Sequence, residues 1–336
     1  MTVEDTIVAT RDGRVGRILL NRPQALNALD LSMIRACAAA LQGWRDDPHV
    51  HAVVIEAAGE RAFCAGGDIR ALRDAQLAGD RTTADRFFRE EYALNQLIAT
   101  YPKPYVALID GICMGGGIGL SVHAPYRVAS EHAGFAMPET AIGFFPDIGA
   151  TFVLPRLPGE LGTYLGLTGL RVNGADAVHA GFATHYTPRV RMAELSAALA
   201  RDGVTALAEY DETLPPFSLG ADRPAVDHCF SADTISDIVR RLEAVDAAWA
   251  VAALKAMRTV SPSALHWTLR ALRRGRDLTL PQALNAEFAL TRTTMAHPDF
   301  AEGVRAMVVD KDRKPAWAPA TIEAVDPAAI AALFGG

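Results

Sequence analysis

The arrangement of apolar and polar residues predicts strands in the first part of the chain. Residues 6–10 and 15–20 are rich in β-branched residues, and the turn-forming residues 11–14 separate them, a pattern typical of a β-hairpin. Continuous apolar runs predict buried strands at three further places: residues 50–57, 105–109 and 126–129. Because helical periodicity lies between these runs, we expect an α/β sheet with crossover connections.

The second part of the chain has a helical pattern. An amphipathic helix is predicted around residues 192–200, and the pattern beyond about residue 231 contains no strand signal. Four helices are predicted there, at residues 233–245, 248–259, 263–274 and 280–293. We therefore expect an α/β core over residues 1–200, followed by a helical C-terminal region over residues 226–336. The polar residues 69–83 match neither pattern and indicate a mobile lid.

Composition and charge exclude several classes of function. The net charge of −6 provides no basic field for nucleic acid, and no apolar run reaches the ~18 residues of a membrane span. Four cysteines show no metal-ligand spacing and are too few for a disulfide scaffold. The acidic start of the chain does not resemble a secretory signal. These features predict a cytoplasmic protein without a bound metal.

Two glycine clusters follow predicted strands. The first is Ala65-Gly66-Gly67-Asp68 and the second runs from Gly115 to Gly119. Neither matches the GxGxxG fingerprint or the phosphate-binding P-loop. Glycine loops can instead present paired backbone N–H groups to a carbonyl oxygen, as an oxyanion hole does, and a helix that starts at the second cluster would add its dipole. The alternative interpretation is two tight turns.

Three carboxylates interrupt apolar surroundings. Glu91 lies on the apolar stripe of the helix predicted at 85–100, Glu139 follows Met137-Pro138, and Asp147 follows two phenylalanines and a proline. Apolar surroundings raise the pKa of a carboxyl group, which suits proton transfer at neutral pH. The alternatives are an edge position for Glu91, a helix N-terminal acid at Glu139 and an N-cap at Asp147.

Other nucleophile and metal patterns are weak. Residues 119–123 resemble a serine nucleophile elbow but end in His123, and Ser121 lies inside the predicted helix rather than at its turn. His49 and His51 alternate at the start of a strand with no further ligands. The sequence therefore favours carboxylate chemistry over a serine nucleophile or a metal.

Four segments together resemble the crotonase, or enoyl-CoA hydratase/isomerase, superfamily: residues 21–29 (NRPQALNAL), 62–69 (AFCAGGDI), 103–120 (KPYVALIDGICMGGGIGL) and 137–157 (MPETAIGFFPDIGATFVLPRL). The resemblance implies a spiral of ββα turns that binds an acyl-CoA thioester. It assigns the oxyanion hole to the N–H groups of Gly67 and Gly116. It implies that CoA lies along Ala25, Leu26, Ala65, Gly67, Asp68 and Ile69. It also implies a homo-oligomer, a trimer or hexamer, with no cofactor other than the CoA of the substrate.

One glycine narrows the resemblance. Hydratases of the superfamily carry their first glutamate three residues after the second oxyanion glycine, and this chain has Gly119 there. Residues 87–95, 136–149 and 300–317 instead resemble the 3-hydroxyisobutyryl-CoA hydrolases, thioesterases of valine breakdown. This implies Glu139 as nucleophile or general base, with Glu91 and Asp147 contacting the substrate. An enoyl-CoA hydratase or isomerase and an inactive acyl-CoA-binding protein remain the alternatives.

Overall fold

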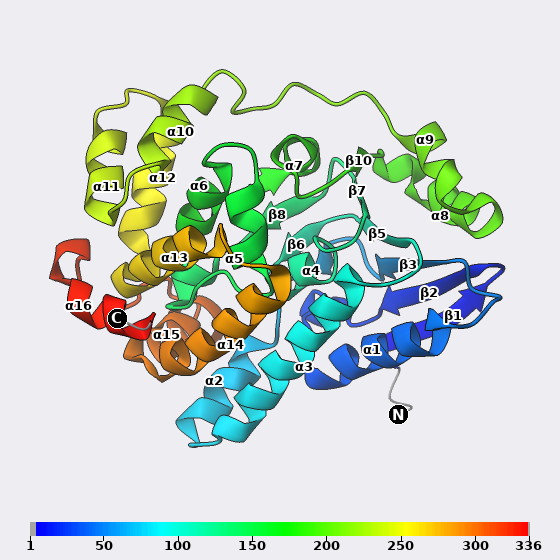
Figure 1. Cartoon of the computed structure of the whole chain (residues 1–336), viewed down its shortest axis with the longest axis horizontal. Coiled ribbons are helices and arrows are strands. Elements are labelled where there is room, and N and C mark those ends of the chain that lie inside the picture. The colour runs from blue at the N-terminus through cyan, green and yellow to red at the C-terminus, as the bar shows by residue number, and fades with distance from the viewer. Residues whose placement is uncertain (1–4, 335–336) are drawn as a thin grey trace. The chain divides into compact units, whose positions relative to one another are not determined.

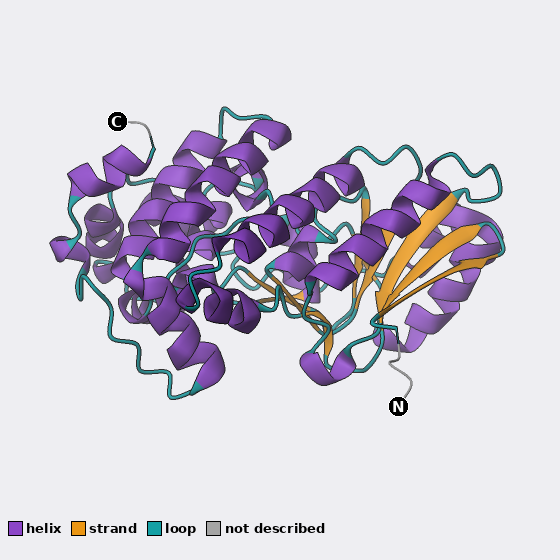
Figure 2. Cartoon of the chain, turned by 90° about the horizontal axis from the view of Figure 1, so that it is seen from below, coloured by secondary structure: helices purple, strands orange, loops and turns teal. Residues whose placement is uncertain are grey.

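The structure is a computed structural model that describes residues 5–334, with helices and strands distributed unevenly along the chain (Figures 1 and 2). It forms two compact units, each assembled from three stretches of sequence. Unit 1 comprises Met1–Asp68, Arg89–Phe135 and Val172–Ser218. Unit 2 comprises Ile69–Phe88, Ala136–Arg171 and Leu219–Gly336. The division at residues 200–226 that the sequence suggests stays a prediction.

Unit 1 contains both sheets. The six-stranded sheet has the order β1-β2-β3-β5-β7-β10, in which β1 and β2 form an antiparallel hairpin and the remaining neighbours are parallel. The bounds are β1 Ile7–Asp12, β2 Val15–Leu20, β3 Ala52–Ala57, β5 Tyr105–Ile109, β7 Tyr126–Ala129 and β10 His185–Tyr186. The predicted hairpin and the three predicted buried strands are therefore confirmed.

Helices cover both faces of this sheet, which explains its continuous apolar strands. Helix α1 (Leu31–Arg45) packs on β1 and β2, and the Trp44 ring occupies the space that a side chain at Gly16 would need. On the other face, helix α8 (Arg189–Asp202) contributes Leu195 and Leu199 to a core with residues of β2, β3, β5 and β7.

The second sheet has four short strands in the order β4-β6-β8-β9. Their bounds are β4 Ala62–Cys64, β6 Ile112–Met114, β8 Gly134–Ala136 and β9 Val172–Asn173. The sequence analysis missed these strands, because two or three residues are too few to show a period-2 pattern. The remaining helices of unit 1 are η1 Pro23–Ala25, α4 Gly116–Gly119, α7 Gly174–Ala180, η4 Gly203–Ala206 and α9 Leu207–Tyr210.

Unit 2 is helical. Its longer helices are α6 Leu161–Thr168, α10 Arg223–Phe230, α11 Ile235–Glu243, α12 Ala248–Thr259, α13 Pro262–Gly275 and α14 Leu280–Ala296. The shorter ones are η2 Glu139–Ile142, α5 Ala150–Val153, η3 Leu154–Arg156, α15 Pro298–Val304, η5 Arg305–Val309, η6 Ile322–Ala324 and α16 Pro327–Leu333. All residues of α6 are buried, and the Tyr164 ring contacts Phe230 and Trp249. The predicted α/β fold with a helical C-terminal region is confirmed.

The segment at residues 69–83, which the sequence leaves without a clear pattern, is helical, and its role as a mobile lid stays a prediction. It forms helix α2 (Ile69–Leu77) and the start of helix α3 (Arg81–Ala99). Within unit 2, Arg70 donates a hydrogen bond to the carbonyl oxygen of Val308 (2.9 Å), and Arg73 donates one to that of Ala301 (3.0 Å). The sequence of the segment is polar partly because it contains arginines, and two of these arginines form hydrogen bonds within unit 2. Arginine, alanine and leucine also favour a helix.

Candidate active site

The first predicted CoA-binding loop is held in a left-handed turn. After η1, both Leu26 (φ 53°) and Asn27 (φ 54°) adopt positive φ. The buried Asn27 side chain accepts a hydrogen bond from the N–H of Arg22 (2.8 Å). It donates to the carbonyl oxygens of Ala58 (3.1 Å) and Ala62 (3.0 Å). Asparagine tolerates this conformation better than most residues, so its amide fixes the loop without a glycine.

The predicted CoA-binding residues of unit 1 meet in one place. The N–H of Ala65 donates to the carbonyl oxygen of Leu26 (3.0 Å), which joins the two predicted segments directly. The guanidinium of Arg22 bonds to the carboxylate of Asp68 through both terminal nitrogens (3.1 Å each). Ile69, the last residue of the set, begins helix α2 in unit 2.

Gly67 lies beside Leu29 in an isolated parallel bridge. Two hydrogen bonds form the bridge. The N–H of Leu29 donates to the carbonyl oxygen of Gly66 (2.8 Å), and the N–H of Asp68 donates to the carbonyl oxygen of Leu29 (2.8 Å). Both bonds involve the peptide groups that flank Gly67, so the N–H of Gly67 takes no part in the bridge. This is the donor that the resemblance assigns to the oxyanion hole.

Gly116 lies next to this loop. It is the first residue of α4, and the first N–H groups of a helix have no intrahelical partner. A Cβ built on Gly66 (φ +108°) would lie 3.9 Å from the nitrogen of Gly116, so the two glycine loops are adjacent. The helix is one turn long, and the sequence analysis expected it to include Ser121. Its dipole is correspondingly smaller than expected.

Glu91 is packed against the second glycine loop. It comes from helix α3 and is 3 % exposed. A Cβ on Gly116 would lie 2.6 Å from its Oε1 atom and 3.1 Å from Cδ1 of Leu29. One turn further along the helix, Asn95 donates to the carbonyl oxygen of Gly119 (3.1 Å). The alternative of an edge position for Glu91 is therefore excluded, since its carboxylate is buried beside Gly116.

The other nucleophiles of this region are not available. The Ser121 hydroxyl is 1 % exposed and donates to the carbonyl oxygens of Gly117 and Ile118 (both 3.1 Å). Burial, together with the charge of Glu91, raises the pKa of the Cys64 thiol to about 12. A thiol with this pKa is not ionised at neutral pH. The carboxylates are thus the remaining reactive side chains.

Glu139 and Asp147 belong to unit 2. Glu139 is the first residue of η2, so the prediction of a helix N-terminal acid is confirmed, and its side chain is buried. Gly143 ends η2 in the left-handed region (φ 66°), where the Asp299 backbone occupies the space of a Cβ. Asp147 is also buried. It is not the N-cap of α5, because Gly149 holds that position.

Aromatic rings surround the chain between these two carboxylates. Phe144 contacts Phe145 (ring centroids 4.7 Å apart), stacks on Phe88 (5.7 Å) and contacts Phe300 (5.8 Å). The N–H of Phe144 donates to the carbonyl oxygen of Glu139 (3.0 Å). The rings fix the path of the chain that carries both carboxylates.

A fourth buried carboxyl group, Glu287 on α14, was missed by sequence reasoning. It accepts hydrogen bonds from the N–H of Gly149 (2.7 Å), the N–H of Thr151 (2.9 Å) and the Thr151 hydroxyl (2.5 Å). Burial raises its pKa to about 8 against the effect of these bonds, and the charge of Asp147 adds to the rise. Its only sequence signal is a carboxylate on the apolar face of a predicted helix.

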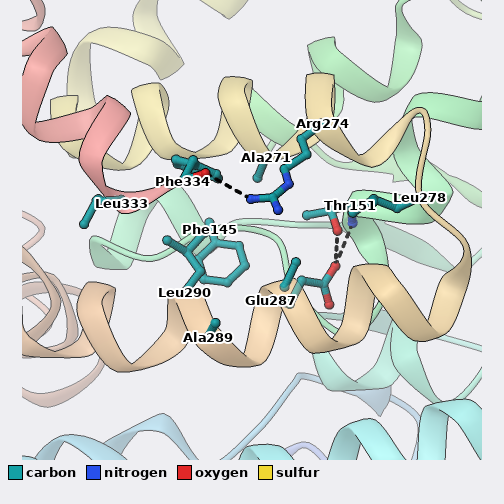
Figure 3. Close-up of a pocket in the computed structure, with 11 residues that line it drawn as sticks. Phe145, Thr151, Ala271, Arg274, Leu278, Glu287, Ala289, Leu290, Leu333 and Phe334 are labelled. Atoms are coloured by element: carbon teal, nitrogen blue, oxygen red, sulfur yellow. Dashed lines mark hydrogen bonds between the residues drawn. The ribbon is translucent and has the colours of Figure 1, made fainter. Parts of the chain in front are cut away.

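Glu287 also borders a cavity of about 150 Å³ in unit 2 (Figure 3). The cavity is lined in part by Phe145, Thr151, Arg274, Leu278, Glu287 and Phe334. The guanidinium of Arg274 donates to the carbonyl oxygen of Phe334 (3.4 Å), so the last turn of the described chain closes one side. Within residues 5–334, no cluster of three or more His, Cys, Asp or Glu has the arrangement of a metal site. None of the described helices is long and apolar enough to cross a membrane.

Comparison with known proteins gives a consistent family. A model of the family described as enoyl-CoA hydratase/isomerase matches residues 15–334. Among curated proteins, the mitochondrial 3-hydroxyisobutyryl-CoA hydrolase of Xenopus laevis is 45% identical over 96% of this chain and 87% of its own length. The human protein of the same name is 43% identical over 96% of this chain and 86% of its own.

Two solved structures share the fold over nearly the whole chain. A protein from Mycobacterium thermoresistibile, described as a carnitinyl-CoA dehydratase, has a TM-score of 0.95 at 40% identity and covers 99% of this chain and 97% of its own. One from Rhodobacter sphaeroides, described as an enoyl-CoA hydratase, has a TM-score of 0.93 at 43% identity, over 98% and 97%.

The comparisons correct the predicted location. The curated relatives are mitochondrial enzymes, so the cytoplasmic assignment is contradicted. The assignment rested on cysteines without disulfide spacing, and all four are free in the structure. Reduced cysteines indicate a reducing compartment, and they do not distinguish one such compartment from another.

Proposed function

The chain belongs to the enoyl-CoA hydratase/isomerase family, and we propose that it is an acyl-CoA thioester hydrolase that converts 3-hydroxyisobutyryl-CoA to 3-hydroxyisobutyrate and CoA, a step of valine degradation. The observation that carries this proposal is 43–45% identity to hydrolases of that name over about 95% of the chain. The glycine at position 119, where hydratases of the family have a glutamate, supports hydrolysis over hydration.

The proposed oxyanion hole consists of backbone N–H groups. The thioester carbonyl oxygen accepts hydrogen bonds from Gly67 and Gly116, whose loops are adjacent in unit 1. Preorganised donors of this kind stabilise the negative charge that develops on the oxygen in the transition state. The CoA moiety lies along Ala25-Leu26 and residues 65–69, and the hydrogen bonds between these segments support their assignment to one ligand.

Glu139 supplies the reacting carboxylate in the proposal. In one route its oxygen bonds to the carbonyl carbon, the C–S bond breaks, and CoA leaves as a thiolate; water then hydrolyses the mixed anhydride and releases the acid. In the other route Glu139 takes a proton from the attacking water. Both routes consume one water and yield one acid and one CoA. Buried Asp147 and Glu91 contact the acyl group, with Asp147 binding its hydroxyl.

The test measures free-thiol release with 3-hydroxyisobutyryl-CoA, 3-hydroxypropionyl-CoA and isobutyryl-CoA. We expect the hydroxylated substrates to be hydrolysed and Glu139→Ala to abolish CoA release, because the variant lacks the reacting carboxylate. Near-ultraviolet circular dichroism checks that the variant is folded. Normal turnover by folded Glu139→Ala would end the proposal. Tight acyl-CoA binding without turnover by the unaltered protein would instead favour an inactive binding protein.

The second candidate is an enoyl-CoA hydratase. The name of the solved relative from Rhodobacter sphaeroides favours it. The assay measures hydration of crotonyl-CoA at the same enzyme concentration as the thiol assay. The loss of absorbance of the conjugated double bond reports the reaction. Hydration faster than thiol release would reverse the order of the two candidates.

The proposal includes a homo-oligomer, a trimer or hexamer, as the resemblance implies. Light scattering of the purified full chain measures its mass directly. The mass of a single chain, 35.9 kDa, would contradict this part of the proposal.

A further inference from the structure

Glu287 has no role in the proposed chemistry, yet it is a costly residue to bury. Its side chain is 1 % exposed, and taking a carboxyl group out of water is unfavourable unless hydrogen bonds replace the lost hydration. It comes from α14, far along the sequence from its partners, and it accepts three hydrogen bonds from two residues, Gly149 and Thr151. Figure 3 shows the side chain reaching from its helix to Thr151.

These two partners lie two and four residues after Asp147 in the sequence. The turn begins where the N–H of Ala150 donates to the carbonyl oxygen of Asp147 (2.8 Å). Both residues inside it have positive φ: Ile148 at 57° and Gly149 at 82°. A β-branched residue such as isoleucine rarely adopts this conformation, which persists only where the surrounding structure enforces it. Glu287 supplies that constraint, because its carboxyl group accepts hydrogen bonds from the N–H groups of Gly149 and Thr151, on the C-terminal side of Ile148.

We propose that Glu287 is a positioning residue that holds the strained turn of residues 147–151 and thereby orients Asp147 toward the hydroxyl of the acyl group. This inference rests on the proposed function, since Asp147 is assigned to the hydroxyl only there. Substrate selection then depends on two residues: Asp147 binds the hydroxyl, and Glu287 fixes the position of Asp147.

The experiment compares 3-hydroxyisobutyryl-CoA with isobutyryl-CoA, which lacks only the hydroxyl. The readout is the ratio of kcat/KM for the two thioesters, called the hydroxyl preference. A variant that merely weakens the fold lowers both rates alike and leaves this ratio unchanged. A variant that misplaces Asp147 lowers the ratio, because Asp147 then no longer bonds to the hydroxyl that only the hydroxylated substrate carries.

The main variant is Glu287→Gln, which keeps the size of the side chain. An amide nitrogen cannot accept a hydrogen bond, so one of the two N–H groups loses its acceptor. We expect the hydroxyl preference to fall about tenfold, the order of effect of leaving one buried N–H group without its acceptor. Thr151→Val removes only the hydroxyl bond and should lower the preference by a smaller factor. It keeps the test decisive if Glu287→Gln does not fold.

The matched control is Glu160→Gln in the same unit. Glu160 also accepts from a threonine, Thr163 (2.7 Å), and it pairs with Arg273 (2.8 Å) and Arg276 (2.6 Å), and none of these interactions involves the turn of residues 147–151. We expect this variant to keep the hydroxyl preference of the unaltered protein. An equal fall of the hydroxyl preference in Glu160→Gln and in Glu287→Gln would overturn the inference.

Asp147→Asn separates the two proposals. If it leaves the hydroxyl preference unchanged, the assignment of Asp147 in the proposed function is wrong. If it lowers the preference while folded Glu287→Gln and Thr151→Val do not, the proposed function stands and the positioning role of Glu287 is overturned. We expect Asp147→Asn to have the larger effect, and the double variant with Glu287→Gln to lose little more than Asp147→Asn alone.

Discussion

The glycine loops of unit 1 (residues 65–67 and 115–116) and the carboxylate turn of unit 2 (residues 139–151) present their functional groups in different ways. The glycine loops offer main-chain N–H groups and need the absence of side chains. The carboxylate turn offers side chains and needs other side chains to hold it, as Glu287 does. In the proposed function, stabilisation of an oxyanion therefore depends on the path of the backbone, whereas selection of the acyl group depends on individual side chains.

The sharpest way to test the backbone side of this contrast is Gly116→Ala. The new methyl group would lie 2.6 Å from the Glu91 carboxylate and 3.1 Å from Leu29, so the loop or Glu91 must move. Misplacing one oxyanion donor costs roughly a hundred- to thousand-fold in rate. We expect a loss of that size in kcat with 3-hydroxyisobutyryl-CoA.

Gly43→Ala is the control for this substitution. Gly43 lies in helix α1, where an added Cβ would have nothing within 4 Å. We expect unchanged kcat and a slight rise in stability, since alanine favours a helix over glycine. A folded Gly116→Ala variant with the kcat of the Gly43→Ala variant would show that this loop does not bind the oxyanion.

A middle-sized effect is expected where side chains support the glycine loops from outside. Arg22 bonds to the Ala28 carbonyl oxygen (3.0 Å) and to Asp68, so Arg22→Met should loosen the predicted CoA-binding loops. We expect KM for the acyl-CoA to rise by about tenfold with kcat less affected, since hydrogen bonds to charged groups contribute about 1.5–3 kcal/mol. Arg35→Met, which removes an exposed pair with Glu90, is the control and should leave KM unchanged.

The last prediction concerns the stability of the carboxylate turn rather than activity, and the size of the effect depends on pH. The pKa of Glu287 is raised from 4.5 to about 8 by burial, so the folded protein binds a proton that the unfolded chain has released. This contribution is fully present below about pH 4.5 and is lost as the pH rises to about 8. Between these values the free energy of unfolding should fall by up to about 1.4 kcal/mol per pH unit relative to Glu287→Gln.

Denaturant titrations of both proteins at pH 5, 6, 7 and 8 measure this difference. Glu160→Gln sharpens the comparison, because hydrogen bonds to Thr163, Arg273 and Arg276 outweigh burial and lower the pKa of Glu160. Its contribution has the opposite sign: it is present above about pH 4.5 and is lost as the pH falls. Parallel curves for Glu287→Gln and the unaltered protein would show that the Glu287 carboxyl group is not held protonated.

The sequence predicted the elements whose patterns are long and regular. The strand β5 and the helix α12 were predicted with the bounds that the structure shows, because each is a continuous apolar run or a clear helical period. The second sheet was missed, since strands of two or three residues show no period. Helix α2 was not predicted, because its arginines bind backbone oxygens that only the folded chain brings near.

The candidate site divides along the same line. Glycines and carboxylates within recognisable motifs, such as Gly67 and Glu139, could be named from the sequence, although their roles stay proposals. Asn27 and Glu287 could not, because their partners are backbone groups whose position only the fold decides. Residues such as these belong to no sequence motif, and they are recognised in the structure by the burial of a polar side chain.

The adjacency of the two glycine loops also bears on how such a protein can change its chemistry over time. Main-chain N–H groups remain after any substitution that preserves the path of the chain and is not proline, so a descendant would keep the proposed oxyanion hole while side chains elsewhere vary. In contrast, Gly119 and each carboxylate of unit 2 are single residues that can be substituted one at a time. New reactions can thus be reached by steps that each retain thioester activation.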